Sequence, residues 1–460
     1  VYEGKHTKYR GQATKDNLFK LELDSKKFQL GALGQHILNL STMAMQRVND
    51  TRNVDVEAPL ASDPLTGYTV RMGKVFKYGE PMGVFAQTYS FLNPITRFNW
   101  GVSLMDDIAF NEKLTMKLGA RYDLFSTKDD RKGGAQNMGY IDYLLRNMQG
   151  AAMNFDPIND KESGFSFLGV VSYAHSQLLN ASYRFSTGFR VPNTEEKYFQ
   201  FYSAWPSFIV LSNRDLKAEK SYNHELEFNG RGKGFGYLLS LYYNQYSDFI
   251  ELKQGTLAVK EPLMQAPKSI SYVKNVNQTS AHLKGFDAAL QLYPGEWVDL
   301  LKGFMVSSAF SYAEGSSSSG MSMLGIQPLT GNIGVEYTDP KARWQVNIKA
   351  NLYFAKPVSQ TTFWDKDAAG KELIRRYPAS FMSNAYTFDA YGYYKVTRNF
   401  TVRLGIYNIL NSEYLRWDDL RQLTNPALLS NINYFFQDGK KSLSRFSRPK
   451  RYISLALEYK

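Results

Sequence analysis

The stretch Tyr452-Ile-Ser-Leu-Ala-Leu-Glu-Tyr459, close to the end of the chain, decides the fold. Its odd-numbered positions from Ile453 to Tyr459 are all apolar or aromatic, while the even-numbered positions are mostly small or polar. Alternation with a period of two indicates a β-strand, because successive side chains of a strand point to opposite faces of the sheet. A strand with one apolar face and one mixed face fits a wall with lipid outside and a watery lumen inside.

The same alternation recurs along the chain and predicts roughly seventeen strands. Beside 452–459, the clear segments are 97–110, 114–125, 165–175, 178–187, 221–231, 236–252, 280–293, 303–314, 328–338, 343–355, 385–396 and 400–410, and the weaker ones are 15–24, 27–42, 67–77 and 82–90. Single-chain bacterial barrels have an even number of strands. The odd count therefore predicts that the chain, which starts at Val1, begins inside a barrel.

The connections between these strands alternate between short and long. Tight turns are expected at 111–113, 176–177, 232–235, 339–342 and 397–399, with 294–302 as a longer member of this set. Long connections are expected at 126–164, 188–220, 253–279, 315–327, 356–384 and 411–450. Short periplasmic turns and long external loops are typical of outer-membrane barrels. The sequence therefore predicts an all-β protein, a transmembrane antiparallel β-barrel with long extracellular loops, as one domain over residues 1–460.

Composition agrees with a barrel and excludes several other classes. The 460 residues are 15% aromatic, yet mean hydropathy is −0.40. No apolar run approaches the ~18 residues of a membrane helix, whereas a spanning strand needs apolar side chains on its lipid face alone. The chain has no cysteine, which excludes disulfides and cysteine-based metal sites. Its net charge of +12 is spread along the chain, with a concentration near the tail. A basic rim facing lipopolysaccharide, or an acidic protein partner, fits this pattern at least as well as nucleic-acid binding does.

Three stretches carry a family resemblance. The first, Asn99–Asp123, is a strand ending in acidic residues followed by a strand that ends Gly-Ala-Arg-Tyr-Asp. The second pairs Phe189-Arg-Val-Pro192 with Asn213-Arg-Asp-Leu-Lys-Ala-Glu219, and the third is Val402–Asp419. All three resemble TonB-dependent outer-membrane receptors. The second is similar to the paired boxes of haem and haemoglobin receptors, and the third to the branch for haemoglobin, transferrin and lactoferrin.

The resemblance implies a barrel of about twenty-two strands closed by a globular plug. Roughly seventeen of those strands would lie in this chain. The plug, the segment that engages TonB and the first strands would lie outside it. In the paired boxes, the resemblance assigns the motif positions to Phe189, Arg190, Pro192, Asn213, Leu216 and Glu219.

Some motif residues also have physical explanations. Pro192 lacks a backbone N–H, so strand pairing is expected to end there. Gly119 and Gly405, inside predicted strands, are expected to relieve crowding or to permit a bend in the wall.

The function implied by the resemblance is TonB-dependent uptake of haem iron from haemoglobin or a haemoglobin complex. The alternatives are a transferrin or lactoferrin iron receptor, a siderophore receptor and a passive porin. Expected partners are the host protein, the TonB complex acting through the plug, outer-membrane lipid and an accessory surface lipoprotein. Haem or iron would be cargo rather than a resident cofactor, and no enzymatic activity is expected.

The long connection after Pro192 holds the strongest candidates for ligand contact. Residues 193–212 contain no histidine, which haem receptors of this type commonly use to bind iron. The candidates there are Tyr198, Phe199, Tyr202, Trp205 and Phe208, and those in the last long connection are Trp417 and Asp418. Partner contact, haem ligation by a tyrosinate and simple packing are all open for the aromatic cluster.

The remaining polar residues suggest neither a metal site nor catalysis. The five histidines are not spaced as metal ligands, and those near predicted strands are interpreted as wall residues. The pairs Asp106/Asp107, Asp129/Asp130 and Asp418/Asp419 have no histidine beside a candidate serine. Solvation or loop calcium therefore explains these carboxylates better than hydrolysis does.

Overall fold

The computed structural model describes residues 5–58, 68–71, 74–77, 85–89, 95–129, 149–150, 157–204, 207–260, 266–366, 372–377, 383–423 and 447–459. Among these residues, no helix combines the length and the apolar character that crossing a membrane would require.

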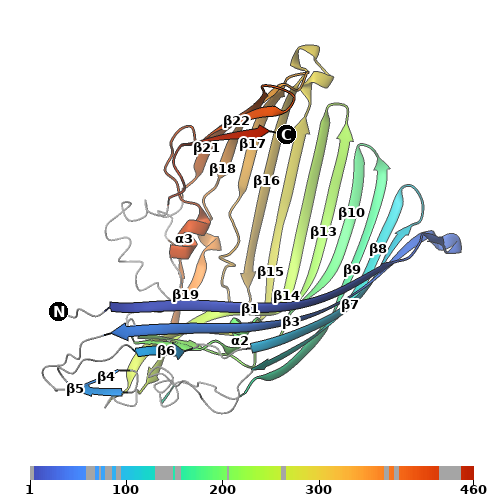
Figure 1. Cartoon of the computed structure of the whole chain (residues 1–460). Coiled ribbons are helices and arrows are strands. Elements are labelled where there is room, and N and C mark those ends of the chain that lie inside the picture. Colours follow the sequence, from blue (N-terminus) through green and yellow to red (C-terminus); the bar gives the residue numbers. More distant parts are fainter. Residues whose placement is uncertain are drawn as a thin grey trace.

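One sheet of 19 strands contains nearly all of the described structure. Its wall strands follow one another in sequence order and are antiparallel throughout. They are β1 (Lys5–Asp24), β3 (Gln35–Ala58), β7 (Ile95–Ala109), β8 (Leu114–Asp129), β9 (Asn159–Ser176), β10 (Leu179–Arg190), β13 (Glu219–Gly232), β14 (Phe235–Val259), β15 (Lys268–Leu292), β16 (Phe304–Ser317), β17 (Thr330–Thr338), β18 (Trp344–Tyr353), β21 (Ala385–Lys395), β22 (Phe400–Tyr407) and β23 (Tyr452–Tyr459). Within the described residues, β1 pairs only with β3 and β23 only with β22, so the curved wall is open (Figure 1).

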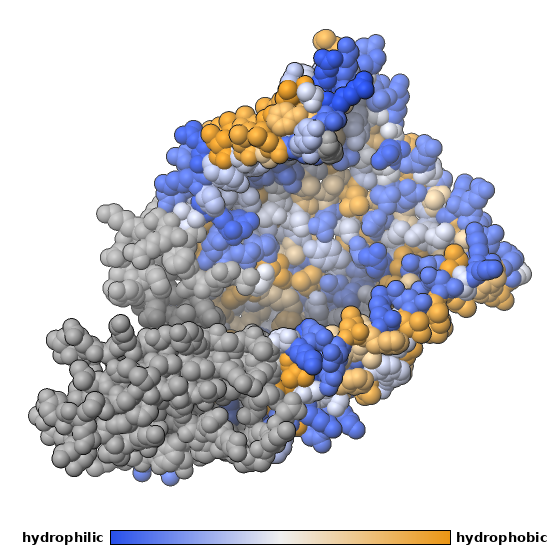
Figure 2. All heavy atoms as spheres, viewed as in Figure 1, coloured by the Kyte–Doolittle hydropathy of each residue, from blue (hydrophilic) through white to orange (hydrophobic). Residues whose placement is uncertain are grey.

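The strand register places apolar side chains in rows across the wall. One row joins Val306, Val335, Ile348, Ala390, Ile406 and Ile453 on six neighbouring strands. The adjacent row on the opposite face joins Ser307, Gly334, Lys349 and Asp389. Ile453 and Leu455 are 68% and 65% exposed, and Figure 2 shows apolar surface over the last strands. The predicted alternation of a lipid face and a lumen face is therefore confirmed.

Tight turns close one end of the wall, as predicted. The turn between β13 and β14 requires glycine, because Gly234 has a φ of +80° and a Cβ there would lie 2.8 Å from the Trp297 ring. The longer connection before β16 folds into two 3-10 turns, η2 (Pro294–Glu296) and η3 (Asp299–Leu301). The long connections lie at the opposite end, where the described helices α2 (Thr194–Tyr198) and α3 (Trp417–Leu423) also lie (Figure 1).

The prediction of a long loop over residues 253–279 is wrong, because strands β14 and β15 continue through most of this range. The two strands are 25 residues each, and they stay paired from Lys253↔Lys274 to Val259↔Lys268. Asp248, with a φ of +53°, interrupts the pairing between Ser247 and Phe249, but the register is the same on both sides of it. The strands seemed to end there because beyond the membrane no lipid face imposes an apolar alternation on the sequence.

Fifteen of the predicted strands lie in the described wall, and two predicted segments do not. Segment 67–77 forms a separate hairpin of β4 (Tyr68–Arg71) and β5 (Lys74–Lys77). Segment 82–90 contains β6 (Phe85–Tyr89), which pairs with the far end of β3. These pieces of four or five residues are too short to span a membrane.

Glycine has different roles at the two predicted strand positions. A Cβ on Gly405 would lie 2.6 Å from the ring of Tyr407, so the predicted crowding is confirmed there. At Gly119 the nearest atom would be the Leu168 Cβ at 3.5 Å, which is an ordinary contact. Crowding does not explain the glycine at position 119.

Candidate functional site at the long-loop end

The paired sequence boxes meet at the long-loop end through a short, well-capped helix. Strand β10 ends at Arg190, just before Pro192, as predicted, and α2 begins after Asn193. The Asn193 side chain accepts from the Glu196 backbone N–H at 2.7 Å, and the Glu196 carboxylate accepts from the Asn193 backbone N–H at 2.9 Å. This reciprocal capping box holds a helix of only five residues.

Arg190 links strand β10 to helix α2 and, through Glu219, to strands β13 and β14. We call the four residues of this network the loop-base clamp: Arg190, Glu196, Glu219 and Ile250. The Arg190 guanidinium donates to Glu219 at the start of β13 and to Glu196 in α2, the latter at 2.8 Å. Glu219 also accepts from the backbone N–H of Ile250 in β14 at 2.6 Å. Charge-assisted hydrogen bonds of this kind are among the stronger ones in proteins. Arg190 and Glu219 therefore hold the base of a long connection.

The second box lies against β15. The Asn213 side chain donates to the Asn275 carbonyl at 2.7 Å, and its backbone N–H donates to the Lys197 carbonyl at 3.1 Å. Leu216 is buried, at 2% exposed. Asn277 accepts from the Lys217 backbone N–H at 2.9 Å. These contacts give Asn213 and Leu216 a role in positioning the loop.

Phe189 packs into a space that only glycine leaves open. A Cβ on Gly164 of β9 would lie 2.6 Å from the Phe189 ring. Phe125 of β8 lies beside it, with 6.3 Å between ring centroids. All six residues to which the resemblance assigns motif positions thus lie at this loop base. They are Phe189, Arg190, Pro192, Asn213, Leu216 and Glu219.

Tyr198 is buried under the loop, at 7% exposed. Its hydroxyl donates to Asp160, and the neighbouring Lys197 amine binds Glu162 at 3.0 Å and Asp160 at 3.2 Å. Burial, and then the hydrogen bond to Asp160, raise the pKa of the Tyr198 phenol. In this structure the Tyr198 side chain is packed beneath the loop, and haem ligation by Tyr198 stays a prediction.

The other aromatic candidates of this loop are placed differently. Phe199 ends α2, and its backbone N–H donates to the Glu195 carbonyl at 3.3 Å. Phe208 is half-buried in β12 (Ser207–Leu211), which pairs in parallel with β15. The backbone of Tyr202 lies in β11 (Phe201–Ala204), but its side chain lies outside the described residues, as does all of Trp205. Ligand contact by Tyr202 and Trp205 stays a prediction.

Trp417 belongs to an aromatic cluster, which we define as Phe363, Tyr377, Trp417 and the partly buried Leu324. Trp417 is 4% exposed and lies edge-on to Tyr377, at 5.2 Å between centroids. Its indole N–H donates to the Leu324 carbonyl at 2.7 Å. Asp418 is half-buried at the rim. The sequence analysis named Trp417 as a candidate for ligand contact, and the structure places its side chain in a buried aromatic cluster.

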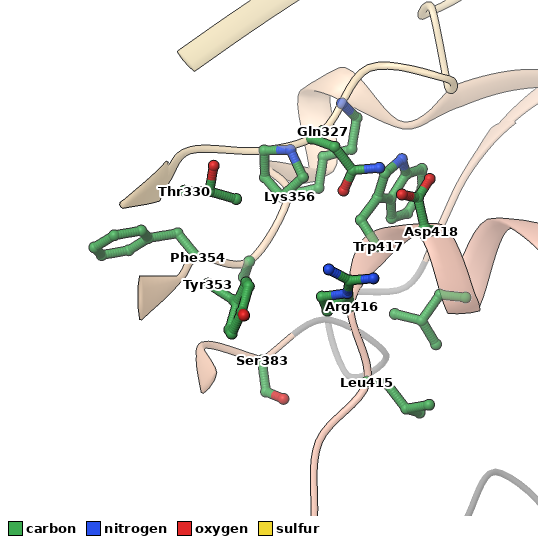
Figure 3. A pocket seen from close by; sticks show the side chains of 13 residues that line it. Gln327, Thr330, Tyr353, Phe354, Lys356, Ser383, Leu415, Arg416, Trp417 and Asp418 are labelled. Atoms are coloured by element: carbon green, nitrogen blue, oxygen red, sulfur yellow. The ribbon is translucent and has the colours of Figure 1, made fainter. Parts of the chain in front are cut away.

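A cavity lies on each side of the aromatic cluster. The Lys356 cavity, of about 230 Å³, is lined by Tyr353, Lys356, Arg416, Trp417 and neighbours (Figure 3). A second, more apolar cavity of about 370 Å³ is lined by Ile250, Met321, Phe363, Trp364 and others. Tyr353 and Thr330 both line the Lys356 cavity, and they are paired with each other across β17 and β18. Their neighbours Gly331 and Leu352 lie on the outward face of these strands, so Tyr353 and Thr330 face the lumen. The Lys356 cavity therefore opens on the lumen side.

The Lys356 cavity is positively charged. Lys356 is 3% exposed, and its amine donates to the Ile326 carbonyl at 2.7 Å and lies 5.4 Å from the centre of the Trp417 ring. Burial lowers the pKa of Lys356 to about 8. The Arg416 guanidinium lies over the Tyr353 ring at 5.8 Å, and its Nε, although buried, has no hydrogen-bond partner. Sequence reasoning missed Lys356 and Arg416.

His36 and His224 are hydrogen-bonded on the wall strands. His36 contacts Asp106 at 2.8 Å, and His224 contacts the Tyr183 hydroxyl at 2.8 Å. In the described part of the chain, no three acidic or histidine side chains converge as metal ligands would. The geometry of the long-loop end is that of a binding surface with positioned cations and aromatic rings.

Comparison with known proteins gives the family. Residues 5–409 match the family model described as TonB dependent receptor-like, beta-barrel. Among curated relatives, Hemoglobin-binding protein A of Haemophilus influenzae is 26% identical over 398 residues, which cover 81% of this chain and 38% of that protein. Hemoglobin-haptoglobin utilization protein B of Neisseria meningitidis serogroup A is 28% identical over 379 residues, covering 76% and 42%. The chain thus spans about two fifths of the length of these relatives.

Solved structures show the same fold. The copper transporter OprC aligns with a TM-score of 0.56 and 15% identity, covering 93% of this chain and 59% of its own. The Serratia marcescens hemophore receptor HasR, in complex with its hemophore and haem, aligns with a TM-score of 0.55 and 13% identity, covering 98% and 66%. With the strand order, the register and the family match, the conclusion is that this chain belongs to the TonB dependent receptor-like β-barrel family of the outer membrane.

Proposed function

We propose that the protein containing this chain takes up haem iron from haemoglobin or a haemoglobin complex. The observation that carries the proposal is the similarity, over about four fifths of the chain, to proteins named for haemoglobin and haemoglobin-haptoglobin binding. The loop-base clamp supports it, because the paired boxes that resemble those of haem receptors are brought together there.

In the proposed mechanism, the long loops bind the host protein and haem passes down the lumen. The TonB complex supplies the energy through the plug of the complete receptor, and no covalent bond of the haem is made or broken. The clamp and the aromatic cluster act as positioning elements, since they fix the bases of connections whose tips contact the partner. Lipopolysaccharide at the basic rim and a surface lipoprotein are further proposed partners.

Binding to immobilised host proteins tests the proposal. Outer membranes from cells with and without the gene are solubilised in mild detergent and passed over haemoglobin, haemoglobin–haptoglobin, transferrin and lactoferrin. We expect retention on the two haemoglobin resins alone, and gene-dependent growth with haemoglobin as sole iron source. Retention on transferrin or lactoferrin alone would assign the protein to that alternative. Retention on none, with growth on a ferric siderophore, would make it a siderophore receptor.

A further inference from the structure

The Lys356 cavity has an unbalanced charge that a ligand could neutralise. Among the described residues that line it, Asp418 is the only acid, and Asp418 already has an interaction of its own. The nearby Asp419 is neutralised by Arg448, at 2.8 Å between Oδ1 and Nη2. Glu314 attracts Lys356 electrostatically, but its carboxylate is paired with Lys284 at 3.0 Å. Lys356 and Arg416 therefore face one cavity without a counter-ion of their own, an arrangement that costs free energy unless an anion is present.

The geometry also points to a flat ligand. Tyr353 and Phe354 line one side of the cavity, and Trp417 lies across from them (Figure 3). The Tyr353 ring is held in place by Tyr414, which is stacked on it at 5.4 Å and 19° and lies outside the lining. At about 230 Å³ the cavity is smaller than the sites that enclose a drug-sized molecule. It fits one edge of a larger planar molecule, with the rest extending into the lumen.

We propose that the Lys356 cavity binds the carboxylate-bearing edge of a planar aromatic ligand. The Arg416 guanidinium supplies a planar donor pair for the carboxylate, and Lys356 supplies a point charge beside it. Gln327, Thr330 and Ser383 provide further hydrogen-bonding groups around the same opening. That the natural ligand is haem, held through its carboxylates, rests on the proposed function, whereas the carboxylate site itself does not.

The first test uses 2-naphthoate and its neutral isostere 2-naphthamide, titrated into the protein purified from outer membranes in amphipol. We expect calorimetric binding of the carboxylate and at least tenfold weaker binding of the amide. Arg416→Gln and Lys356→Met should each weaken naphthoate about tenfold, and Arg416→Lys should weaken it less. Arg398→Gln and Lys341→Met, in the tight turns, are the matched controls and should have no effect. Equal binding of acid and amide, or equal affinity in all variants, would overturn the site.

The second test separates the site from the proposed function, using haem and haem dimethyl ester on the same variants. We expect haem to bind more tightly than its ester in the unmodified protein, with that preference lost in Arg416→Gln. If the protein binds naphthoate but does not bind haem, the carboxylate site stands and haem is rejected as its ligand. Equal binding of haem and ester would keep haem uptake and reject carboxylate recognition here. The mobility of the unheated protein in detergent gels verifies that each variant is folded.

Discussion

Arg190 bonds carboxylates of two separate elements, strand β13 and helix α2. It bonds Glu219 and Glu196, and Glu219 in turn binds the backbone of β14. Removing it leaves Glu219, whose side chain is only 10% exposed, without its cation. An uncompensated carboxylate at that depth is costly, although the half-exposed Arg190 moderates the loss.

Arg190→Gln should therefore lower the free energy of unfolding by about 1–2 kcal/mol. The matched control is Arg403→Gln, which breaks a more exposed pair with Glu458 at 3.0 Å and a contact with the Tyr393 ring, and should cost under about 0.5 kcal/mol. Urea titrations followed by gel mobility of the folded form measure both. Equal losses in the two variants would contradict the role given to the clamp.

Lys356 should titrate far below an ordinary lysine, because burial disfavours its charged form. After reductive methylation, its ¹³C-dimethyl signal should shift with a midpoint near 8, identified by its loss in Lys356→Arg. The reference is a lysine in a model peptide, whose pKa is about 10.4. Between these values the unfolded chain binds more protons than the folded one, so stability should rise with pH from about 8 upward. A midpoint above 10 for Lys356 would contradict the burial.

Single residues of the site were only partly predictable. The family pattern around Trp417 was visible in the sequence, because Tyr407 to Trp417 is a contiguous motif. Lys356 carries no such pattern. Its cavity is assembled from three separate connections, and nothing in the sequence around Lys356 indicates that Trp417 and Arg416 will lie beside it.

At the scale of strands, the wall depends on which face each side chain occupies. Ile333 lies in an outward row with Ser308, Ala350 and Phe388, whereas the adjacent Asn332 faces the lumen. A charge is costly in lipid and tolerated in a water-filled lumen.

Ile333→Lys should therefore destabilise the folded barrel by about 2–4 kcal/mol, and Asn332→Lys by much less. The measurement is the folded fraction in lipid vesicles across a urea series, read from gel mobility. A larger loss for Asn332→Lys would invert the assignment of the two faces.

Alternation predicted the wall strands well, since lipid and lumen impose a strict period of two on each of them. It failed where other constraints dominate. At Asp248 the pairing is interrupted without a change of register, and beyond it β14 and β15 continue as an extension to which β12 adds in parallel. Strands that pair outside the membrane do not need an apolar face, so the sequence of this extension lacks the alternation of apolar and polar residues.

For the whole molecule, the separation of tight turns from long connections sets the orientation in the membrane. Ser318 lies at an exposed long-loop position, and Lys341 lies in the tight turn between β17 and β18. Because the chain has no cysteine, single cysteines introduced into it add labelling sites where the chain has none.

In intact cells, a membrane-impermeant maleimide should label Ser318→Cys and leave Lys341→Cys unlabelled. After lysis both should react. Labelling of Lys341→Cys alone in intact cells would show that the barrel has the opposite orientation.

The parallel pairing of β12 with β15 has a consequence for how the molecule folds. Neighbouring strands of the wall follow one another in the wall order, whereas Phe208 meets Ser271 only after β13 and β14 have come between them. Closing that larger loop costs chain entropy before any contact rewards it. The segment around β12 should therefore dock late in folding, onto a hairpin that has already formed.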